Sequence, residues 1–135
     1  MKVQFGTIAA NGGCIYAASD ITIKNSIIDS CISTSNTKYG GAIYSGGALT
    51  MENSTVSNGT ANHYGGGISS QGGTLTDVTF TDNHVIYAHG GAIYNRDNLL
   101  TINGTANTFT NNYGDIGSTD YGGTIYSTKS EERSG

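Results

Sequence analysis

The chain has 135 residues, enough for one domain, and charged residues make up only 12% of it. A formal net charge of −4 argues against nucleic-acid binding, which needs a clustered basic face. No stretch of about 18 apolar residues is present, so we expect no membrane insertion by this segment.

The first residues, Met1 to Gly6, contain no apolar segment of the signal-peptide type and resemble the end of an earlier repeat. The tail after Ser127 follows closely on another glycine pair. We therefore expect residues 1–135 to form one repeat domain that is a segment of a longer protein.

A short motif, Gly-Gly-x-Ile-Tyr or a close variant, occurs five times. Its copies begin at Gly12, Gly40, Gly65, Gly90 and Gly122, which gives steps of 28, 25, 25 and 32 residues. Near-constant spacing in this range indicates a repeat architecture. Glycine pairs supply positive φ or close backbone approach, so we assign one corner of each repeat to them. The pairs in the last four copies are Gly40 and Gly41, Gly65 and Gly66, Gly90 and Gly91, and Gly122 and Gly123.

The repeat that starts at Gly40 shows how one unit is built. Apolar and polar residues alternate over 42–44, 49–51 and 55–57, and turn-forming residues separate these stretches. No apolar stripe of helical period is sustained. The sequence predicts an all-β, single-stranded parallel β-helix of four to five coils, each with about 25 residues and three short strands. The usual crossover preference makes it right-handed.

Equivalent apolar residues should stack inside this solenoid. The first column is Ile15, Ile43, Ile68, Ile93 and Ile125. The second is Ile21, Leu49, Leu75 and Leu100, and the third is Ile28, Val56, Phe80 and Phe109. The residue spacing assigns Val78 to a fourth column with Ile23, Met51 and Ile102.

The two cysteines, Cys14 and Cys31, have no metal-ligand spacing and form no disulfide framework. We interpret them as buried free thiols that pack as small hydrophobes. The alternative is a disulfide, which requires the first coil to bring their Cα atoms within about 7 Å.

A second motif, Phe-x-x-Asn, alternates in register with Gly-Gly-Ala-Ile. It occurs from Phe80 to Asn83 and from Phe109 to Asn112. Together the two motifs resemble the repeat of chlamydial polymorphic outer-membrane proteins and related adhesin-like β-helix proteins. The resemblance implies a non-enzymatic module at the cell surface or secreted, whose partners are proteins or glycans of host or neighbouring cells.

Two outward-facing ladders are candidate binding surfaces. One is the tyrosine ladder of Tyr16, Tyr44, Tyr94 and Tyr126, interrupted by Ser69. Exposed tyrosines suit glycan or protein recognition, although they can also simply stack to stabilise a sheet. The other is a threonine face that includes Thr79, Thr81, Thr108 and Thr110. It is ordinary strand chemistry or, alternatively, a surface similar to that of β-helical ice-binding proteins.

Aromatic residues also precede the glycine pairs, as Tyr39, Tyr64, His89 and Tyr121. We predict a stacked aromatic corner there, with no metal. Arg96 and Asp97 are interpreted as a solvated pair in a turn. The remaining function alternative is a polysaccharide lyase-like enzyme, which needs converging carboxylates. Asp29 and Asp82 lie two coils apart, so we expect no catalytic residues and no cofactor. Unpaired strand edges at both ends predict end-to-end association.

Overall fold

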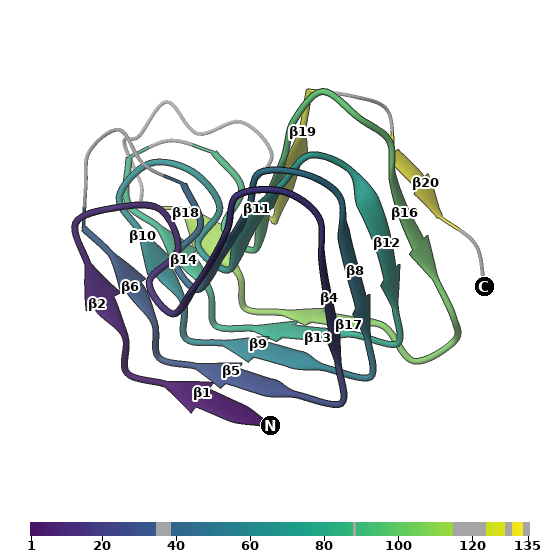
Figure 1. The fold of residues 1–135 in the computed structure, drawn as a ribbon, viewed down its shortest axis with the longest axis horizontal. Coiled ribbons are helices and arrows are strands. Elements are labelled where there is room, and N and C mark those ends of the chain that lie inside the picture. The colour runs from purple at the N-terminus through teal and green to yellow at the C-terminus, as the bar shows by residue number, and fades with distance from the viewer. Residues whose placement is uncertain (35–38, 88, 115–123, 129–130, 134–135) are drawn as a thin grey trace.

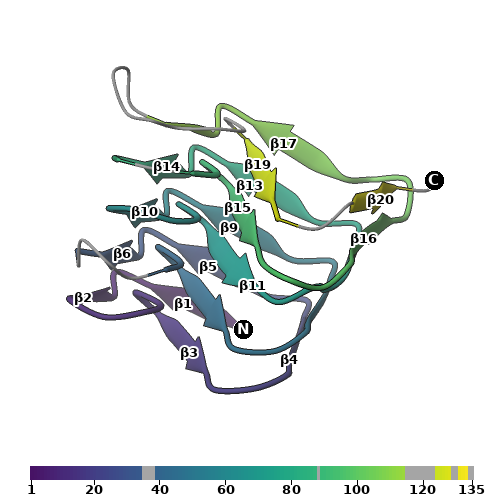
Figure 2. The same cartoon turned by 90° about the horizontal axis from the view of Figure 1, so that it is seen from above.

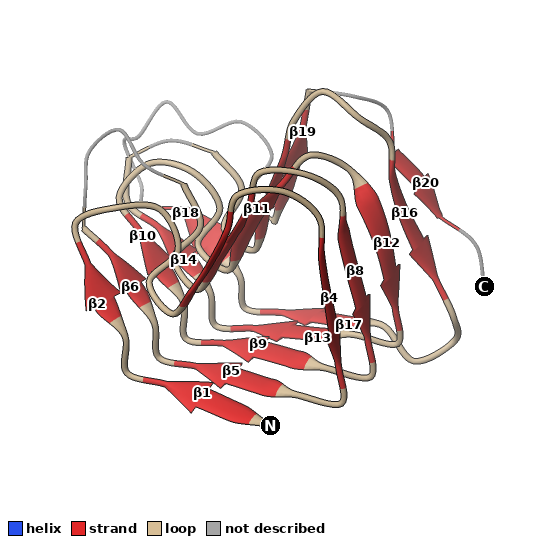
Figure 3. Cartoon of the chain, in the orientation of Figure 1, coloured by secondary structure: helices blue, strands red, loops and turns tan. Residues whose placement is uncertain are grey.

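The computed structural model describes residues 1–34, 39–87, 89–114, 124–128 and 131–133, and its regular structure there consists of strands alone. The strands form four parallel five-stranded sheets. Each strand pairs with its equivalents in the neighbouring coils, so the chain is a parallel β-solenoid, as predicted (Figures 1 and 3). Figure 2 shows the coils piled in chain order, with the N-terminal coil at one end.

The four sheets are named A to D and run the length of the stack. Sheet A contains β1 (Lys2–Gln4), β5 (Ile27–Asp29), β9 (Thr55–Ser57), β13 (Thr79–Thr81) and β17 (Thr108–Thr110). Sheet B contains β2 (Thr7–Ile8), β6 (Ile32–Ser33), β10 (Thr60–Ala61), β14 (His84–Val85) and β18 (Tyr113–Gly114). Sheet C contains β3 (Ile15–Ala17), β7 (Ile43–Ser45), β11 (Ile68–Ser70), β15 (Ile93–Asn95) and β19 (Ile125–Ser127). Sheet D contains β4 (Ile21–Lys24), β8 (Leu49–Glu52), β12 (Gly73–Thr76), β16 (Leu100–Asn103) and β20 (Glu131–Arg133).

Each coil therefore has four strands, where the sequence predicted three. The additional strands are those of sheet B, which have two residues each. Two residues are too few to show the alternation of apolar and polar side chains by which strands are recognised.

The isoleucine column is confirmed. Ile68 pairs with Ile43 on one side and with Ile93 on the other, and all three side chains are fully buried. The third column is also confirmed, because Phe80 pairs with Val56 and Phe109. The rings of Phe80 and Phe109 stack with centroids 5.3 Å apart.

The assignment of Leu75 and Val78 was wrong. Gly73 pairs with Leu49 and Leu100, and Leu75 pairs with Met51 and Ile102, so Leu75 belongs to the fourth column. The second column has no side chain in this coil. Val78 lies at the corner before β13, where its N–H donates to Asn107 Oδ1 at 3.0 Å. Gly73 has no side chain, so the sequence shows no apolar residue at the second column in this coil. The spacing of apolar residues therefore assigned Leu75 to the wrong column.

Residues with positive φ mark the corners between sheets. One corner has Asn25, Asn53, Asp77 and Gly104, and another has Phe5, Ser30, Asn58, Asp82 and Asn111. Asn and Asp tolerate the left-handed region better than other side chains, because they can hydrogen-bond locally. The turn chemistry of the sequence thus sets where each coil bends.

The two glycines of each pair are needed for different reasons. Gly40 has φ of +75°, a conformation strained for any L side chain. At Gly41 a Cβ would lie 2.0 Å from the Gly66 carbonyl oxygen of the next coil and 2.7 Å from the backbone nitrogen of Thr60. The first glycine turns the chain, and the second lets neighbouring coils approach. Gly122 and Gly123 lie outside the described residues.

Cys14 and Cys31 form a disulfide, with Cα atoms 5.6 Å apart, so the expectation of free thiols was wrong. The carbonyl of Cys31 accepts from Thr60 N, as that of Gly59 accepts from His84 N and that of Asn83 from Tyr113 N. Cys31 therefore occupies, in its coil, the position that is asparagine in the Phe-x-x-Asn motif of later coils. In a later coil Asn83 lies against Gly67, which follows a glycine pair as Cys14 does. The disulfide thus crosslinks two positions whose equivalents, Gly67 and Asn83, are also neighbours in a later coil.

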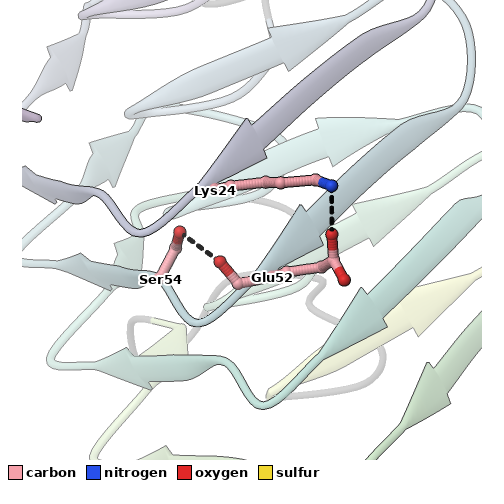
Figure 4. A network of polar contacts seen from close by, with 3 residues as sticks. All are labelled: Lys24, Glu52 and Ser54. Carbon is pink, nitrogen blue, oxygen red and sulfur yellow. Dashed lines mark hydrogen bonds and ion pairs between the residues drawn. The ribbon is translucent and has the colours of Figure 1, made fainter.

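The described side chains form one ion pair between coils. Lys24 on β4 forms an ion pair with Glu52 on β8, with Nζ and Oε2 2.9 Å apart, and the Ser54 hydroxyl donates to the Glu52 carbonyl (Figure 4). Both charged side chains are more than one third exposed, so the pair contributes little to stability. The stack is held by its backbone ladders and apolar columns.

Candidate binding surface

The tyrosine ladder lies on sheet C, where its members occupy the middle of β3, β7, β15 and β19. Tyr16 and Tyr44 stack with ring centroids 5.3 Å apart, and Tyr94 and Tyr126 do so at 5.5 Å. Tyr16 is 61% exposed, whereas the other three are partly buried. The ladder is present as predicted, but most of its area is covered.

The aromatic corner is confirmed for its three described members. Tyr64 forms parallel backbone bridges with Tyr39 and with His89, so the three residues stack coil upon coil. The rings of Tyr39 and Tyr64 are 4.8 Å apart, and those of Tyr64 and His89 are 5.7 Å apart. Tyr121 lies outside the described residues.

The ladder and the corner pack against each other. Figure 1 shows the coil bending inward between sheet B and sheet C, and the corner residues come just before this bend. Tyr94 contacts both Tyr39, at 5.8 Å between centroids, and Tyr64, at 4.8 Å. His89 stacks on Tyr126 at 4.5 Å. The two columns form one continuous aromatic cluster, which covers the outer side of sheet C.

Ser69 leaves a gap in the ladder, and the gap is filled. It is fully buried although it stands at an outward position between Tyr44 and Tyr94, and its hydroxyl has no hydrogen-bond partner among the described residues. The ring of Tyr39 contacts the tyrosines on both sides of the serine, Tyr44 at 6.3 Å and Tyr94 at 5.8 Å. The corner thus supplies the ring that β11 lacks.

Arg96, which follows β15, lies on this cluster. Its guanidinium carbon is 4.8 Å from the Tyr39 ring centroid and 5.3 Å from that of Tyr44. Its Nη2 donates to the Tyr44 hydroxyl at 3.3 Å across a sequence separation of 52 residues. The interpretation of Arg96 and Asp97 as a solvated pair was wrong, because the guanidinium stacks on aromatic rings instead of pairing with its neighbour.

The cluster alters the acid–base chemistry of its central tyrosine. Burial raises the pKa of Tyr94, and the neighbouring Tyr39, Tyr64 and Tyr126 raise it further, against a smaller opposite effect of Arg96. Tyr94 therefore stays neutral and keeps its hydroxyl proton well into the alkaline range.

The threonine face lies on sheet A. Thr79 pairs with Thr108 and Thr81 pairs with Thr110, and they flank the stacked Phe80 and Phe109. Thr55 and Ser57 continue the face on β9, and β5 interrupts it with Ile27 and Asp29. The regular surface thus covers three coils.

Asp29 is fixed at the edge of this face. Its Oδ1 accepts from Ser57 Oγ at 2.7 Å and from Asn58 Nδ2 at 2.9 Å. The hydrogen bond from Asn58 and then that from Ser57 lower the pKa of the Asp29 carboxyl. The carboxylate ties two coils together.

Asparagine side chains form a ladder inside the corner between sheets A and B. Asn83 is fully buried; its Oδ1 accepts from Gly59 N at 2.9 Å, and its Nδ2 donates to Val56 O and to Asn112 Oδ1 at the same distance. Asn112 Nδ2 donates to Phe80 O at 2.8 Å. The Phe-x-x-Asn motif therefore has a structural role, with the phenylalanine in the core and the asparagine bridging coils.

In the part of the chain that the structure describes, no group of three His, Cys, Asp or Glu side chains is arranged to hold a metal ion. No helix there is long and apolar enough to cross a membrane.

Sequence reasoning identified both aromatic columns but missed Arg96 as part of the surface. Two features of the sequence together could have indicated this contact. Ser69 interrupts the tyrosine ladder, and Arg96 follows two residues after Tyr94, the next tyrosine of the ladder. Neither residue is informative alone, because the contact depends on how the coils stack.

The fold and the surface define the class of this protein. It is a parallel β-solenoid repeat protein that has an aromatic outer surface on one sheet. Residues 77–96 match the family model of the Chlamydia polymorphic membrane protein repeat. The matched segment runs from the Asp77 corner through β13, β14 and β15 to Arg96, and it includes Phe80, Asn83 and the glycine pair at Gly90. The resemblance inferred from the two motifs is therefore confirmed for this repeat. No curated protein and no solved structure matches the chain at a significant level.

Proposed function

We propose that this chain is a non-enzymatic, adhesin-like repeat module that is exposed at the cell surface or secreted and contacts proteins or glycans of other cells. The observation that carries the proposal is the match of residues 77–96 to a repeat of Chlamydia polymorphic membrane proteins. The matched segment holds β13, β14 and β15, which are three of the four strand positions of a coil, and the other described coils repeat these strand positions.

The disulfide supports the location. Structural disulfides persist in oxidising compartments and are rare in the cytosol. The Cys14–Cys31 bridge is thus the form expected for a protein that is exported.

The aromatic cluster supports the contact surface. Tyrosine offers a large rigid face with a polar tip, which suits recognition of proteins and sugars. Tyr16 is the most exposed member of the ladder and lies at its N-terminal end. We place the primary contact at Tyr16, since Tyr44 and Tyr94 are partly covered.

A cell-binding assay tests this function. Fluorescent beads coated with the chain are incubated with epithelial and bacterial cells, and bound beads are counted. We expect Tyr16→Ala to reduce binding several-fold. Tyr113→Ala is the matched control, because Tyr113 is 50% exposed but lies on sheet B, stacked on His84 at 4.4 Å. Equal loss in both variants, or no binding by the unmodified chain, would refute the proposal.

A further inference from the structure

The aromatic cluster contains a cation, Arg96, that has no carboxylate partner among the described side chains. The ion pair that these side chains form is Lys24–Glu52. The Nε of Arg96 is buried and has no hydrogen-bond partner among the described residues. A guanidinium held in place with unused donors is unusual, because buried polar groups are generally satisfied.

The position of Arg96 on the aromatic rings determines which of its N–H donors remain available to a ligand. The guanidinium carbon lies over the rings of Tyr39 and Tyr44, and the Tyr44 hydroxyl accepts from Nη2. A guanidinium has five N–H donors, all in its plane. Because Nε is buried, the part of the planar edge that can receive a ligand is the Nη1–Nη2 end, whose fork geometry matches a carboxylate.

An exposed aromatic face lies next to this anion site. Tyr44 contacts Arg96 on one side and stacks on Tyr16 at 5.3 Å on the other. The anion site and the exposed ring of Tyr16 are thus separated by a single tyrosine. A ring of this kind offers an apolar face to the C–H groups of a sugar and a hydroxyl at its tip.

We propose that this surface binds a carboxylated sugar of the uronate or sialate class, with its carboxylate on the planar edge of Arg96 and a neighbouring sugar ring on Tyr16. This inference rests on the proposed function and specifies its ligand. Charge complementarity selects the anion, since the Arg96 guanidinium lies on the cluster, over Tyr39 and Tyr44. The overall charge of the chain would not attract an acidic sugar, because the net charge is −4 and the exposed Asp97 lies beside Arg96 in sequence. The proposed binding therefore depends on the local contact with Arg96.

The test is a binding titration of the intact, oxidised chain with three oligosaccharides: a uronate oligomer, sialyllactose and neutral lactose. We expect one of the two acidic sugars to bind at least tenfold more tightly than lactose, because hydrogen bonds to a charged group contribute more than neutral ones. Whichever acidic sugar binds identifies the source of the carboxylate. Methyl esterification of that sugar should abolish the preference, and this measurement requires no variant.

Variants then locate the contact. Arg96→Gln should lower the affinity for the acidic sugar about tenfold or more, and Arg96→Lys should restore it only in part, since a lysine has no planar fork. Lys24→Gln is the matched control, because it removes a cation on sheet D, away from the cluster, and should leave affinity unchanged. Circular dichroism and the melting temperature verify that each variant is folded.

The outcomes separate this inference from the proposed function. The carboxylated-sugar ligand would be overturned if lactose, the esterified sugar or a polyglutamate peptide bound as tightly as the acidic sugar. The adhesin-like role would still stand in that case if Tyr16→Ala reduced cell binding. Loss of cell binding in Arg96→Gln together with a preference for the acidic sugar supports the inference. Failure to bind both cells and sugars overturns both.

Discussion

At the scale of single residues, polar side chains hold the coils in register where apolar stacking ends. Asp29 illustrates this, because its carboxylate accepts hydrogen bonds from Ser57 and Asn58 of the next coil. The hydrogen bonds favour the ionised form, so the pKa of Asp29 is lower in the folded protein than its ordinary value of 3.8.

This pKa shift predicts an acid-dependent stability. A carboxyl with a lowered folded pKa stabilises the fold above its unfolded pKa, and that contribution is lost as the pH falls from about 3.8 through the lower folded pKa. We expect the free energy of unfolding to decrease in that interval, measured by urea denaturation at successive pH values. In Asp29→Asn the decrease should be smaller, and an unchanged pH profile would contradict the assignment.

Asn83 is the buried polar residue on which the corner ladder depends. Asn83→Ala removes the acceptor of Gly59 N, which leaves this N–H unpaired inside the protein, and it removes one donor to Val56 O. We expect a loss of about 1–3 kcal/mol in the free energy of unfolding, since an unsatisfied buried group costs about that much. Asn98→Ala serves as control, because Asn98 is exposed and its side chain makes only a 3.5 Å contact to Gln71 O. Equal effects would refute the role of Asn83.

At the scale of elements, two coils show a contact between their beginning and their end. In the coil that begins at Gly65 this contact is made by Asn83 of the Phe-x-x-Asn motif, which lies against Gly67, the residue after the glycine pair. In the first coil the Cys14–Cys31 disulfide takes that place. A covalent link at this point fixes the coil regardless of how well its neighbours pack.

Reduction of the disulfide should therefore destabilise the chain. The two cysteines are 17 residues apart, and a loop of about this length corresponds to roughly 3 kcal/mol in the chain-entropy model. We expect urea unfolding in dithiothreitol to show a loss of about 2–4 kcal/mol. The Cys14→Ser/Cys31→Ser variant should match the reduced protein and be insensitive to reductant. An identical midpoint with and without reductant would contradict this structural role.

At the scale of the whole molecule, the four sheets have edges at both ends of the stack. Strands β1 to β4 at one end and β17 to β20 at the other each have a ladder partner on one side only among the described residues. Five of the large exposed hydrophobic residues lie near the N-terminal end of the stack, within residues 1–27: Met1, Phe5, Ile8, Tyr16 and Ile27. Unpaired parallel edges next to apolar side chains favour pairing with another chain.

We propose that the isolated 135-residue chain associates end to end through these edges. Sedimentation velocity over increasing protein concentration should show a shift to larger species. The double variant Phe5→Asn/Ile8→Lys should weaken the association, because it removes two exposed apolar side chains. Asparagine also suits the φ of +62° at position 5, since its equivalents are Ser30, Asn58, Asp82 and Asn111. A monomer at every concentration would refute end-to-end association.

The repeat spacing, the core columns of isoleucine and phenylalanine, and the existence of both aromatic columns were determined by sequence alone. Each depends on a residue type recurring at one place in the coil, and a parallel solenoid turns such recurrence directly into contact. The four-strand coil and the shift at Gly73 were not predictable, because a two-residue strand and a missing side chain leave no periodic signal.

Only the tertiary structure decided how the outside of the solenoid is arranged. The inward bend between sheets B and C brings Tyr39 into the gap at Ser69 and places Arg96 over Tyr44, 52 residues away in sequence. The path of the coil that contains β3 to β6 also brings Cys14 next to Cys31, and the two form a disulfide. Each of these contacts joins residues that occupy different positions in the repeat. Such contacts depend on how the sheets are oriented relative to one another, and the local pattern of residues does not predict that orientation.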